Sequence, residues 1–320
     1  MRDPFREGLA AGWKHIDASQ LAVDLPIEAD VVIIGSGAGG GVTAEILAAN
    51  GLKVVIVEEG PLRTSSDFKM REAEAYPDLY QESAARKTAD KAINILQGRC
   101  VGGSTTVNWT SSFRTPPRTL QWWQSAWGLK RLGVDAMAPW FAAMEQRLHV
   151  GLWPIPPNEN NAALARGAAQ LGIPVAVIPR NVKMCWNLGY CGMGCPTNAK
   201  QSMLLTTLPA ALTNGAMLIS RLCAERFEFS GNKAISLTAL AMKADGIHPS
   251  SVKVTLRARH FVLAGGAVNS PALLLRSKAV DPHGLLGKRT FLHPTLISSG
   301  LFDKPVRAYA GAPQSVYSDH

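Results

Sequence analysis

The feature that most constrains this chain is a glycine-rich turn between a predicted strand and a predicted helix. The apolar run Val31–Ile34 is typical of a strand buried on both faces of a parallel sheet. The turn GSGAGG follows at once and leads into a helical pattern over residues 42–50, and a second strand over residues 53–57 comes next. This order of elements predicts a Rossmann-like, doubly wound α/β domain.

The spacing of the turn is that of a dinucleotide-binding fingerprint. Its first glycine permits the tight turn, its second lets the backbone approach a pyrophosphate, and its third allows the helix to pack closely on the strand. The pyrophosphate takes the unpaired N–H groups at the helix N-terminus. Glu58, at the tip of the second strand, is expected to accept hydrogen bonds from a ribose. The residues predicted to hold the dinucleotide are Gly35, Ser36, Gly37, Ala38, Gly40 and Glu58.

A later strand favours FAD over NAD as the dinucleotide. The segment FVLAGGAVNSP ends a strand in the small residues Ala264–Ala267. A strand that returns to the same sheet in this way brings small residues against the cofactor, as in many large flavoproteins. Close packing without a ligand is the alternative interpretation of this segment.

Composition narrows the class of protein. The chain has 320 residues, of which 47% are hydrophobic, and this is enough for two domains. Its formal net charge is +9, but the charges are scattered and no like-charge block reaches about 5–6 residues, so we expect no nucleic-acid partner. We find neither a secretory signal nor a transmembrane segment and predict a cytoplasmic protein, with a periplasmic or partner-anchored membrane location as the alternative.

Four stretches together resemble a known family. They are VVIIGSGAGG with VVIVEEG, GRCVGGSTTVNW, CGMGCPTNAKQS, and AGGAVNSPALLLRS with GLLGKRTFLHP. Over most of residues 28–300 the chain resembles the glucose–methanol–choline (GMC) family of FAD-dependent alcohol oxidoreductases, in the bacterial branch of long-chain alcohol oxidases and sugar dehydrogenases. The resemblance implies an FAD-binding domain with a second, incomplete α+β substrate domain. The expected segments are 25–115 and 200–300 for FAD, 116–199 for the substrate or cap region, and 301–320 for the start of the truncated substrate domain.

The resemblance also implies residues on the flavin side. Consecutive glycines would let the backbone approach a flat ring that side chains would block. Val107 stands where some members carry a histidine that links FAD covalently, so we expect non-covalent FAD. The backbone of Ala224 is expected to meet the adenine. The residues expected against the flavin and its pyrophosphate are Gly102, Gly103, Ser104 and Asn108.

The activity implied by the resemblance is oxidation of an alcohol, sugar or sugar acid to a carbonyl, with hydride passing to the flavin. In this family the catalytic histidine lies in a C-terminal segment, beyond His320, and His293 is interpreted as structural. We therefore expect a truncated chain that contains no catalytic residue of this type. A non-catalytic flavin-binding or electron-transfer subunit is the alternative, and an NAD-dependent dehydrogenase is a third.

Three of the five cysteines fall in one glycine-rich segment. Cys185, Cys191 and Cys195 form the pattern C-x5-C-x3-C followed by proline, and the glycines between them would let the sulfurs converge. By resemblance to one branch of sugar dehydrogenases, this run would hold a three-iron, four-sulfur cluster that passes electrons to a cytochrome or small subunit. Plain thiols, a disulfide and a zinc site are the alternatives.

Overall fold

The computed structural model describes residues 2–292 and 295–320, which fall into two compact units. The first unit contains the chain up to residue 107 together with 193–198 and 203–299. The second contains 108–192, 199–202 and 300–320. The chain thus crosses between the units several times. His293, which the sequence suggested is structural, lies outside the described residues.

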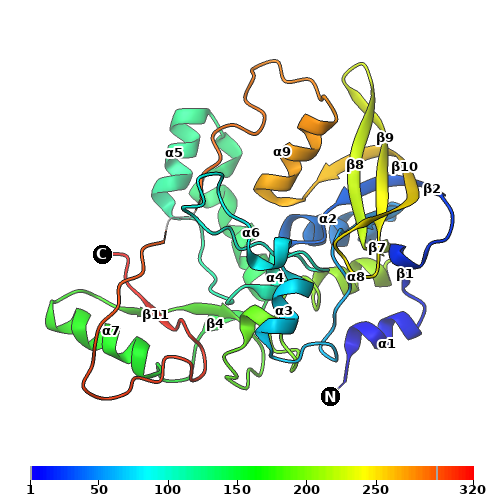
Figure 1. The fold of residues 1–320 in the computed structure, drawn as a ribbon. Helices are drawn as coiled ribbons and strands as arrows, with labels where there is room; N and C mark the ends of the chain where they lie inside the picture. Colours follow the sequence, from blue (N-terminus) through cyan, green and yellow to red (C-terminus); the bar gives the residue numbers. More distant parts are fainter. Residues whose placement is uncertain (1, 293–294) are drawn as a thin grey trace. The chain divides into compact units, whose positions relative to one another are not determined.

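The first unit is built on one mixed sheet (Figure 1). Within the described residues it has seven strands in the order β1-β7-β3-β2-β10-β9-β8. The strands from β1 to β10 in that order run parallel, and β10, β9 and β8 are antiparallel neighbours. The α/β prediction is therefore confirmed. The strands are β1 (Lys14–Asp17), β2 (Leu25–Ile34), β3 (Val54–Val57), β7 (Met217–Ser220), β8 (Leu222–Ser230), β9 (Lys233–Met242) and β10 (Pro249–Leu263).

The position of β2 explains its apolar run. Val31–Ile34 pairs with Val54–Val57 of β3 on one side and with residues 260–263 of β10 on the other. Both edges of this stretch are hydrogen-bonded and all four of its residues are buried. A central parallel strand has no solvent-facing side, so alternation of apolar and polar residues is lost.

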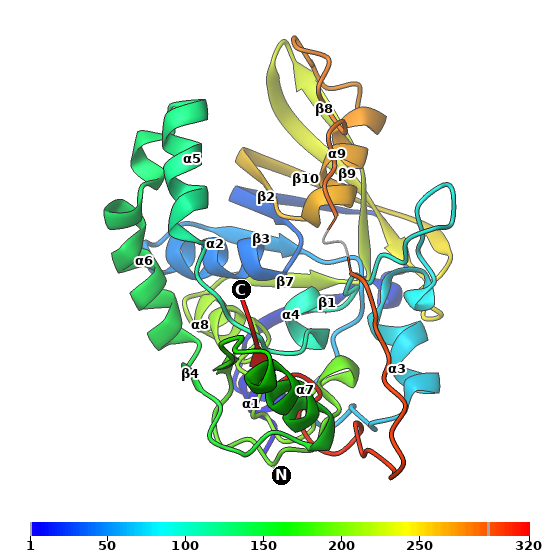
Figure 2. The ribbon, with the colours of Figure 1, turned by 90° about the vertical axis from the view of Figure 1, so that its left-hand side faces the viewer.

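Helices cover the sheet of the first unit. Helix α2 (Ala38–Ala49) packs against β2, β3 and α8 (Thr207–Thr213), an arrangement that can be followed in Figure 2. It begins at Ala38, inside the glycine-rich turn, rather than at residue 42 as the helical pattern predicted. The other helices of this unit are α1 (Pro4–Ala10), η1 (Ala18–Gln20), α3 (Glu72–Leu79), η2 (Gln81–Ala84), α4 (Ser104–Val107) and α9 (Gly266–Arg276).

A continuous apolar core joins the parallel strands to the antiparallel ones. Val32 and Ile34 of β2 belong to the same buried cluster as Phe227 of β8 and Leu256 of β10. Leu273 of α9 joins this cluster, so the late helix is anchored to the sheet by apolar burial. This anchoring fixes where the segment before α9 leaves the sheet.

The second unit combines helices with short antiparallel strands. Strand β4 pairs with β6, and β11 pairs with β5. Asn158 caps α7 by accepting from the backbone N–H of Asn161, and its Nδ2 donates to the carbonyls of Ala308 and Ala310 at 3.1 Å. The elements are β4 (Val150–Leu152), β5 (Ala176–Val177), β6 (Pro179–Asn181), β11 (Val316–Tyr317), α5 (Pro117–Trp127), η3 (Lys130–Leu132), α6 (Val134–Arg147) and α7 (Glu159–Gln170), and η4 (Cys191–Met193) spans the boundary between the units.

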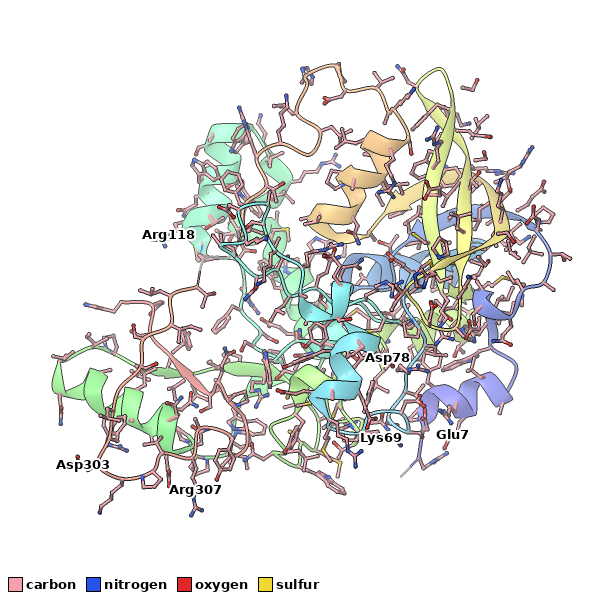
Figure 3. The ribbon with its side chains drawn as sticks, in the orientation of Figure 1. Glu7, Lys69, Asp78, Arg118, Asp303 and Arg307 are labelled. Carbon is pink, nitrogen blue, oxygen red and sulfur yellow. The ribbon has the colours of Figure 1, made fainter. Side chains whose placement is uncertain are left out.

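Charged side chains of both signs occur in each unit. Figure 3 labels Glu7, Lys69 and Asp78 in the first unit, and Arg118, Asp303 and Arg307 in the second. Asp78 forms an ion pair with Arg63.

Among the described residues, no helix is both long enough and apolar enough to cross a membrane.

Candidate functional site

The fingerprint turn is closed by two glycines that meet backbone to backbone. Gly35 has a φ of +102°, in the left-handed region that favours glycine. A Cβ built on Gly40 would lie 1.8 Å from the carbonyl oxygen of Gly35. The first turn of α2 begins with the hydrogen bond from Gly41 N to Gly37 O at 2.8 Å. The N-terminus of α2 therefore lies directly against the end of β2, with its first N–H groups available to an anion.

Ser36 joins three segments that are far apart in the sequence. Its hydroxyl donates to Glu58 Oε2 at 2.6 Å and accepts from the backbone N–H of Gly102 at 3.0 Å. Its own N–H also donates to Glu58 Oε2, at 3.1 Å. One serine thus holds the fingerprint turn, the acidic residue and the second glycine-rich loop in a single network.

Glu58 is an acidic group inside the protein. Its side chain is buried, and this burial raises the pKa of its carboxyl, while hydrogen bonds from Ser36 and from the N–H of Gly60 act in the opposite direction. Oε1 accepts from Gly60 N at 2.9 Å, and this is its one hydrogen bond among the described residues. A carboxylate oxygen can accept more than one hydrogen bond, so Oε1 keeps the capacity to accept from a ribose hydroxyl.

The second glycine-rich loop approaches the first at backbone distance. Gly103 has a φ of +54°, and a Cβ built on it would lie 2.8 Å from the Cα of Gly37. Helix α4 begins at the next residue, Ser104, whose hydroxyl accepts from Gly98 N at 3.0 Å. The two glycine-rich loops therefore share one wall with no side chain between them.

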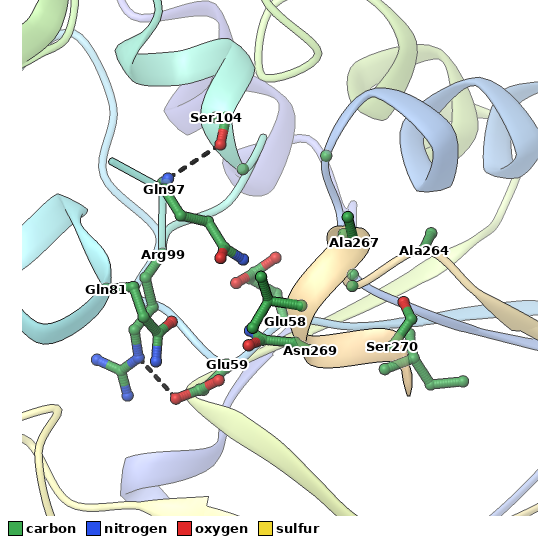
Figure 4. Close-up of a pocket in the computed structure, with 18 of the residues that line it drawn as sticks. Glu58, Glu59, Gln81, Gln97, Arg99, Ser104, Ala264, Ala267, Asn269 and Ser270 are labelled. Carbon is green, nitrogen blue, oxygen red and sulfur yellow. Dashed lines mark hydrogen bonds and ion pairs between the residues drawn. The ribbon is translucent and has the colours of Figure 1, made fainter. Parts of the chain in front are cut away.

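These elements surround a cavity of about 780 Å³ within the first unit (Figure 4). Its volume is in the range of roughly 300–1,000 Å³ usual for cofactor and ligand sites. The segment Ala264–Ala267 also lines it, and its first residue lies against the fingerprint turn, since a Cβ built on Gly35 would lie 2.4 Å from the carbonyl oxygen of Ala264. Of the residues predicted from the sequence, those that line the cavity are Gly35, Gly37, Ala38, Glu58, Gly103, Ser104 and Ala224.

The other predicted residues lie elsewhere. Ser36, Gly40 and Gly102 support the cavity wall through the contacts above and are not among its lining residues. Asn108 belongs to the second unit. There its backbone carbonyl accepts from Lys200 Nζ at 2.7 Å.

The segment 81–99 supplies a further side of the cavity that sequence patterns did not identify. Arg86 Nη1 donates to Gln97 and to Asn269 of α9, both at 3.0 Å, and the side chains of all three residues line the cavity. Arg99 and Glu59 line it as well. The local signal for this pair was its position, since Glu59 follows Glu58 and Arg99 is the second residue of the GRCVGGS stretch.

The prediction of an iron–sulfur cluster is not supported. Within the residues that the structure describes, no group of three or more His, Cys, Asp or Glu side chains is arranged to hold a metal ion. Cys185 and Cys191 belong to the second unit and Cys195 to the first. The sulfurs instead contact hydrogen-bonding groups of the protein: Cys191 lies 3.5 Å from Arg180 Nη2, and Cys195 lies 3.4 Å from the hydroxyl of Thr197.

The comparison with known families decides the identity of the fold. Residues 30–69 match an FAD binding domain, and residues 76–295 match the family described as GMC oxidoreductase. The chain belongs to the GMC oxidoreductase family. Its cavity, with two glycine-rich loops, a helix N-terminus and a buried acid, provides what the ribose and pyrophosphate of FAD require.

Relatives of this GMC chain are known by sequence and by structure. It is 33% identical over 291 residues to the long-chain-alcohol oxidase FAO4B of Arabidopsis thaliana, and 35% identical over 300 residues to an uncharacterised GMC-type oxidoreductase of Mycobacterium tuberculosis. These matches cover 89% and 92% of this chain but 38% and 46% of the relatives, so the chain spans less than half of either.

Solved structures show the same fold. The crystal structure of pyridoxine 4-oxidase from Mesorbium loti has a TM-score of 0.58 at 22% identity, and the match covers 78% of this chain and 52% of that one. A formate oxidase variant from Aspergillus oryzae has a TM-score of 0.55 at 16% identity, covering 81% of this chain and 48% of the other.

Proposed function

We propose that this GMC chain binds FAD without a covalent link and belongs to an enzyme that oxidises a CH–OH group to a carbonyl. The observation that carries the proposal is the joining of the fingerprint turn, Glu58 and the Gly102–Gly103 loop by Ser36 around one cavity. FAD accepts a hydride from the substrate carbon when it is bound. We propose as its binding residues the set predicted from the sequence, including Asn108 on the flavin side.

The residues of the chain perform distinct parts of this binding. The N-terminus of α2 offers backbone N–H groups and its positive dipole end to the pyrophosphate. Glu58 accepts from a ribose hydroxyl through Oε1, and its negative charge disfavours a dinucleotide with a 2′-phosphate. The missing side chain of Gly103 lets the two glycine-rich loops meet, and the small residues of Ala264–Ala267 leave room in the cavity for flat rings.

The substrate that we propose is a small-molecule alcohol, including a long-chain alcohol, or a sugar-type molecule, with a cytochrome or small subunit as an electron acceptor and no nucleic-acid partner. The names of the relatives support an alcohol as donor, since several are long-chain-alcohol oxidases. For the location we retain the cytoplasm, with periplasmic or membrane association through a partner as the alternative, to be decided by cell fractionation.

The first experiment measures flavin and turnover separately. The purified chain is incubated with FAD, freed of excess by gel filtration, and examined by visible absorption before and after addition of a long-chain alcohol under anaerobic conditions. Flavin bands that persist on the protein and bleach with alcohol support the full proposal. Bound flavin that alcohol does not bleach favours the non-catalytic flavin-binding subunit, and absence of bound flavin refutes FAD binding. Release of the flavin by acid precipitation tests that it is non-covalent.

A further inference from the structure

Two adjacent acidic residues follow β3, and they have different surroundings. Glu58 is engaged by Ser36 and Gly60, whereas Glu59 forms an ion pair with Arg99, with Arg99 Nε 2.8 Å from Glu59 Oε1. Both members of this pair line the cavity, and Figure 4 shows the contact as a dashed line. The cavity therefore contains a second charged group that the dinucleotide fingerprint does not explain.

The segment that carries Glu59 lies beside the start of β8. The chain at Glu58–Gly60 is hydrogen-bonded to the start of β8, through Leu222 N to Glu58 O at 2.9 Å and Arg221 N to Gly60 O at 3.0 Å. The next residues of β8, Cys223 and Ala224, line the same cavity, and Cys223 is close enough to Glu59 and Arg99 for both charges to affect its pKa. In a dinucleotide-binding fold the acid at the tip of the second strand marks the adenosine ribose, so the base extends past it toward β8.

The pair is largely withdrawn from solvent but not saturated with hydrogen bonds. The Arg99 side chain is 11% exposed and that of Glu59 is 27% exposed. Within the described part of the chain, the Nη1 and Nη2 groups of Arg99 and the Oε2 atom of Glu59 make no hydrogen bond. The pair thus has donors and an acceptor that remain unused on the cavity wall. Such groups have the capacity to bind a polar ligand.

The thiol of Cys223, which lines the same cavity, is affected by the charge of Glu59. Cys223 has its pKa raised to about 12, first by burial and then by the negative charge of Glu59.

The unused groups match the edge of adenine. Adenine offers ring nitrogens that accept hydrogen bonds and an exocyclic amino group that donates them. The guanidinium supplies donors and a flat face on which an aromatic ring can stack, and the carboxylate supplies an acceptor. We propose that Glu59 and Arg99 recognise the adenine base, so that this pair selects an adenine dinucleotide over one with another purine. This assignment rests on the proposed binding of FAD in the cavity.

The test compares three flavins on the full chain by fluorescence titration: FAD, FMN, and the FAD analogue in which hypoxanthine replaces adenine. Hypoxanthine has a carbonyl oxygen in place of the amino group, and FMN lacks the adenylate altogether. We expect FAD to bind at least about tenfold more tightly than the hypoxanthine analogue. Glu59→Gln adds an N–H donor that suits the carbonyl, so the preference should fall to threefold or less.

Arg99→Met keeps the length of the side chain and removes its donors. It should weaken FAD and the hypoxanthine analogue alike by about tenfold, and it should leave FMN affinity unchanged. The matched control is Asp78→Asn, which breaks another ion pair of the same unit, Arg63–Asp78, neither member of which lines the cavity. Asp78→Asn should change none of the three affinities. Circular dichroism and the unfolding temperature confirm that each variant is folded.

The outcomes separate this assignment from the function on which it rests. If the wild-type chain binds FAD but Glu59→Gln keeps the full preference for adenine, the assignment is overturned and the FAD site stands. An equal loss of FAD and FMN affinity in Arg99→Met also overturns it, because the pair would then support the cavity without touching the base. A wild-type chain that binds neither FAD nor FMN overturns the assignment and the proposed function together.

Discussion

The contact between Gly40 and Gly35 predicts that one methyl group at Gly40 opens the cofactor site. In Gly40→Ala the new Cβ would lie 1.8 Å from the Gly35 carbonyl oxygen, whereas real Cβ contacts essentially never come below 3.0 Å. The two atoms must therefore separate by about 1.2 Å. Both belong to backbone, so no side-chain rotation can relieve the clash, and α2 must move away from the end of β2.

The expected change in the stability of Gly40→Ala is the difference between two opposing effects. Forcing an extra carbon into a packed site costs about 1–3 kcal/mol, and alanine in place of glycine within a helix returns about 1 kcal/mol. The loss of FAD affinity should be larger than the loss of stability, because displacing α2 moves its N–H groups from the pyrophosphate. Hydrogen bonds to charged groups contribute about 1.5–3 kcal/mol each. Losing one corresponds to a fall in affinity of roughly 10- to 150-fold.

The assay uses a second substitution in the same turn as its control. A Cβ built on Gly39 would meet Ala264 Cβ at 3.9 Å, an ordinary contact. FAD affinity is measured by fluorescence titration and stability by urea unfolding for Gly39→Ala and Gly40→Ala. We expect Gly39→Ala to stay within about threefold of wild-type affinity. Equal effects of the two substitutions, or wild-type affinity in Gly40→Ala, would refute the steric reasoning.

Three further predictions concern other parts of the first unit. Ser36→Ala removes a hydroxyl that donates to buried Glu58 and accepts from Gly102, so the free energy of unfolding should fall by about 1–3 kcal/mol in urea titrations, and an unchanged value would contradict the network. Because burial and the charge of Glu59 raise the pKa of Cys223 to about 12, iodoacetamide at pH 8 should label this thiol far more slowly in the native chain than in guanidinium, as mass spectrometry of peptides would report; equal rates would show that the thiol is not shielded. Burial lowers the pKa of His15, whose Nε2 lies 2.9 Å from Ser220 Oγ, so the unfolded chain takes up this proton first as the pH falls below about 6.5. Stability should therefore decrease from pH 7 toward pH 5, and His15→Gln should flatten that slope in unfolding temperatures measured across the range, whereas an unaltered slope would assign the pH dependence to other groups.

Local sequence was sufficient for the elements that carry the dinucleotide site. The run Val31–Ile34, the turn after it and the acid at the end of β3 are neighbours along the chain, and their patterns follow from backbone sterics and burial. The α/β class follows from these same segments, whereas the family resemblance rests on four stretches taken together. The start of α2 was placed too late because glycines lower helix propensity, and tertiary packing against β2 overrides that preference here.

The cysteine-rich segment shows where a spacing pattern fails. The pattern C-x5-C-x3-C states how far apart the thiols lie along the chain but not which way each one turns. In the folded chain Cys191 contacts Arg180, a side chain from β6, and Cys195 contacts Thr197 beside it. Metal binding requires that sulfurs converge within bonding distance of one point, and this depends on the path of the whole loop.

By itself, the sequence determined that the chain builds a Rossmann-like FAD-binding fold, because short-range patterns of apolar residues and glycines dictate strand, turn and helix. Only the tertiary structure decided that Ser36 joins Glu58 to Gly102, and that Glu59 and Arg99 form an ion pair on the wall of the cavity. These partners are separated by many residues, and no spacing in the sequence predicts that they contact one another. Their meeting depends on the path of the chain through the sheet, which brings the ends of β2 and β3, the start of β8 and the loop before α4 to one place.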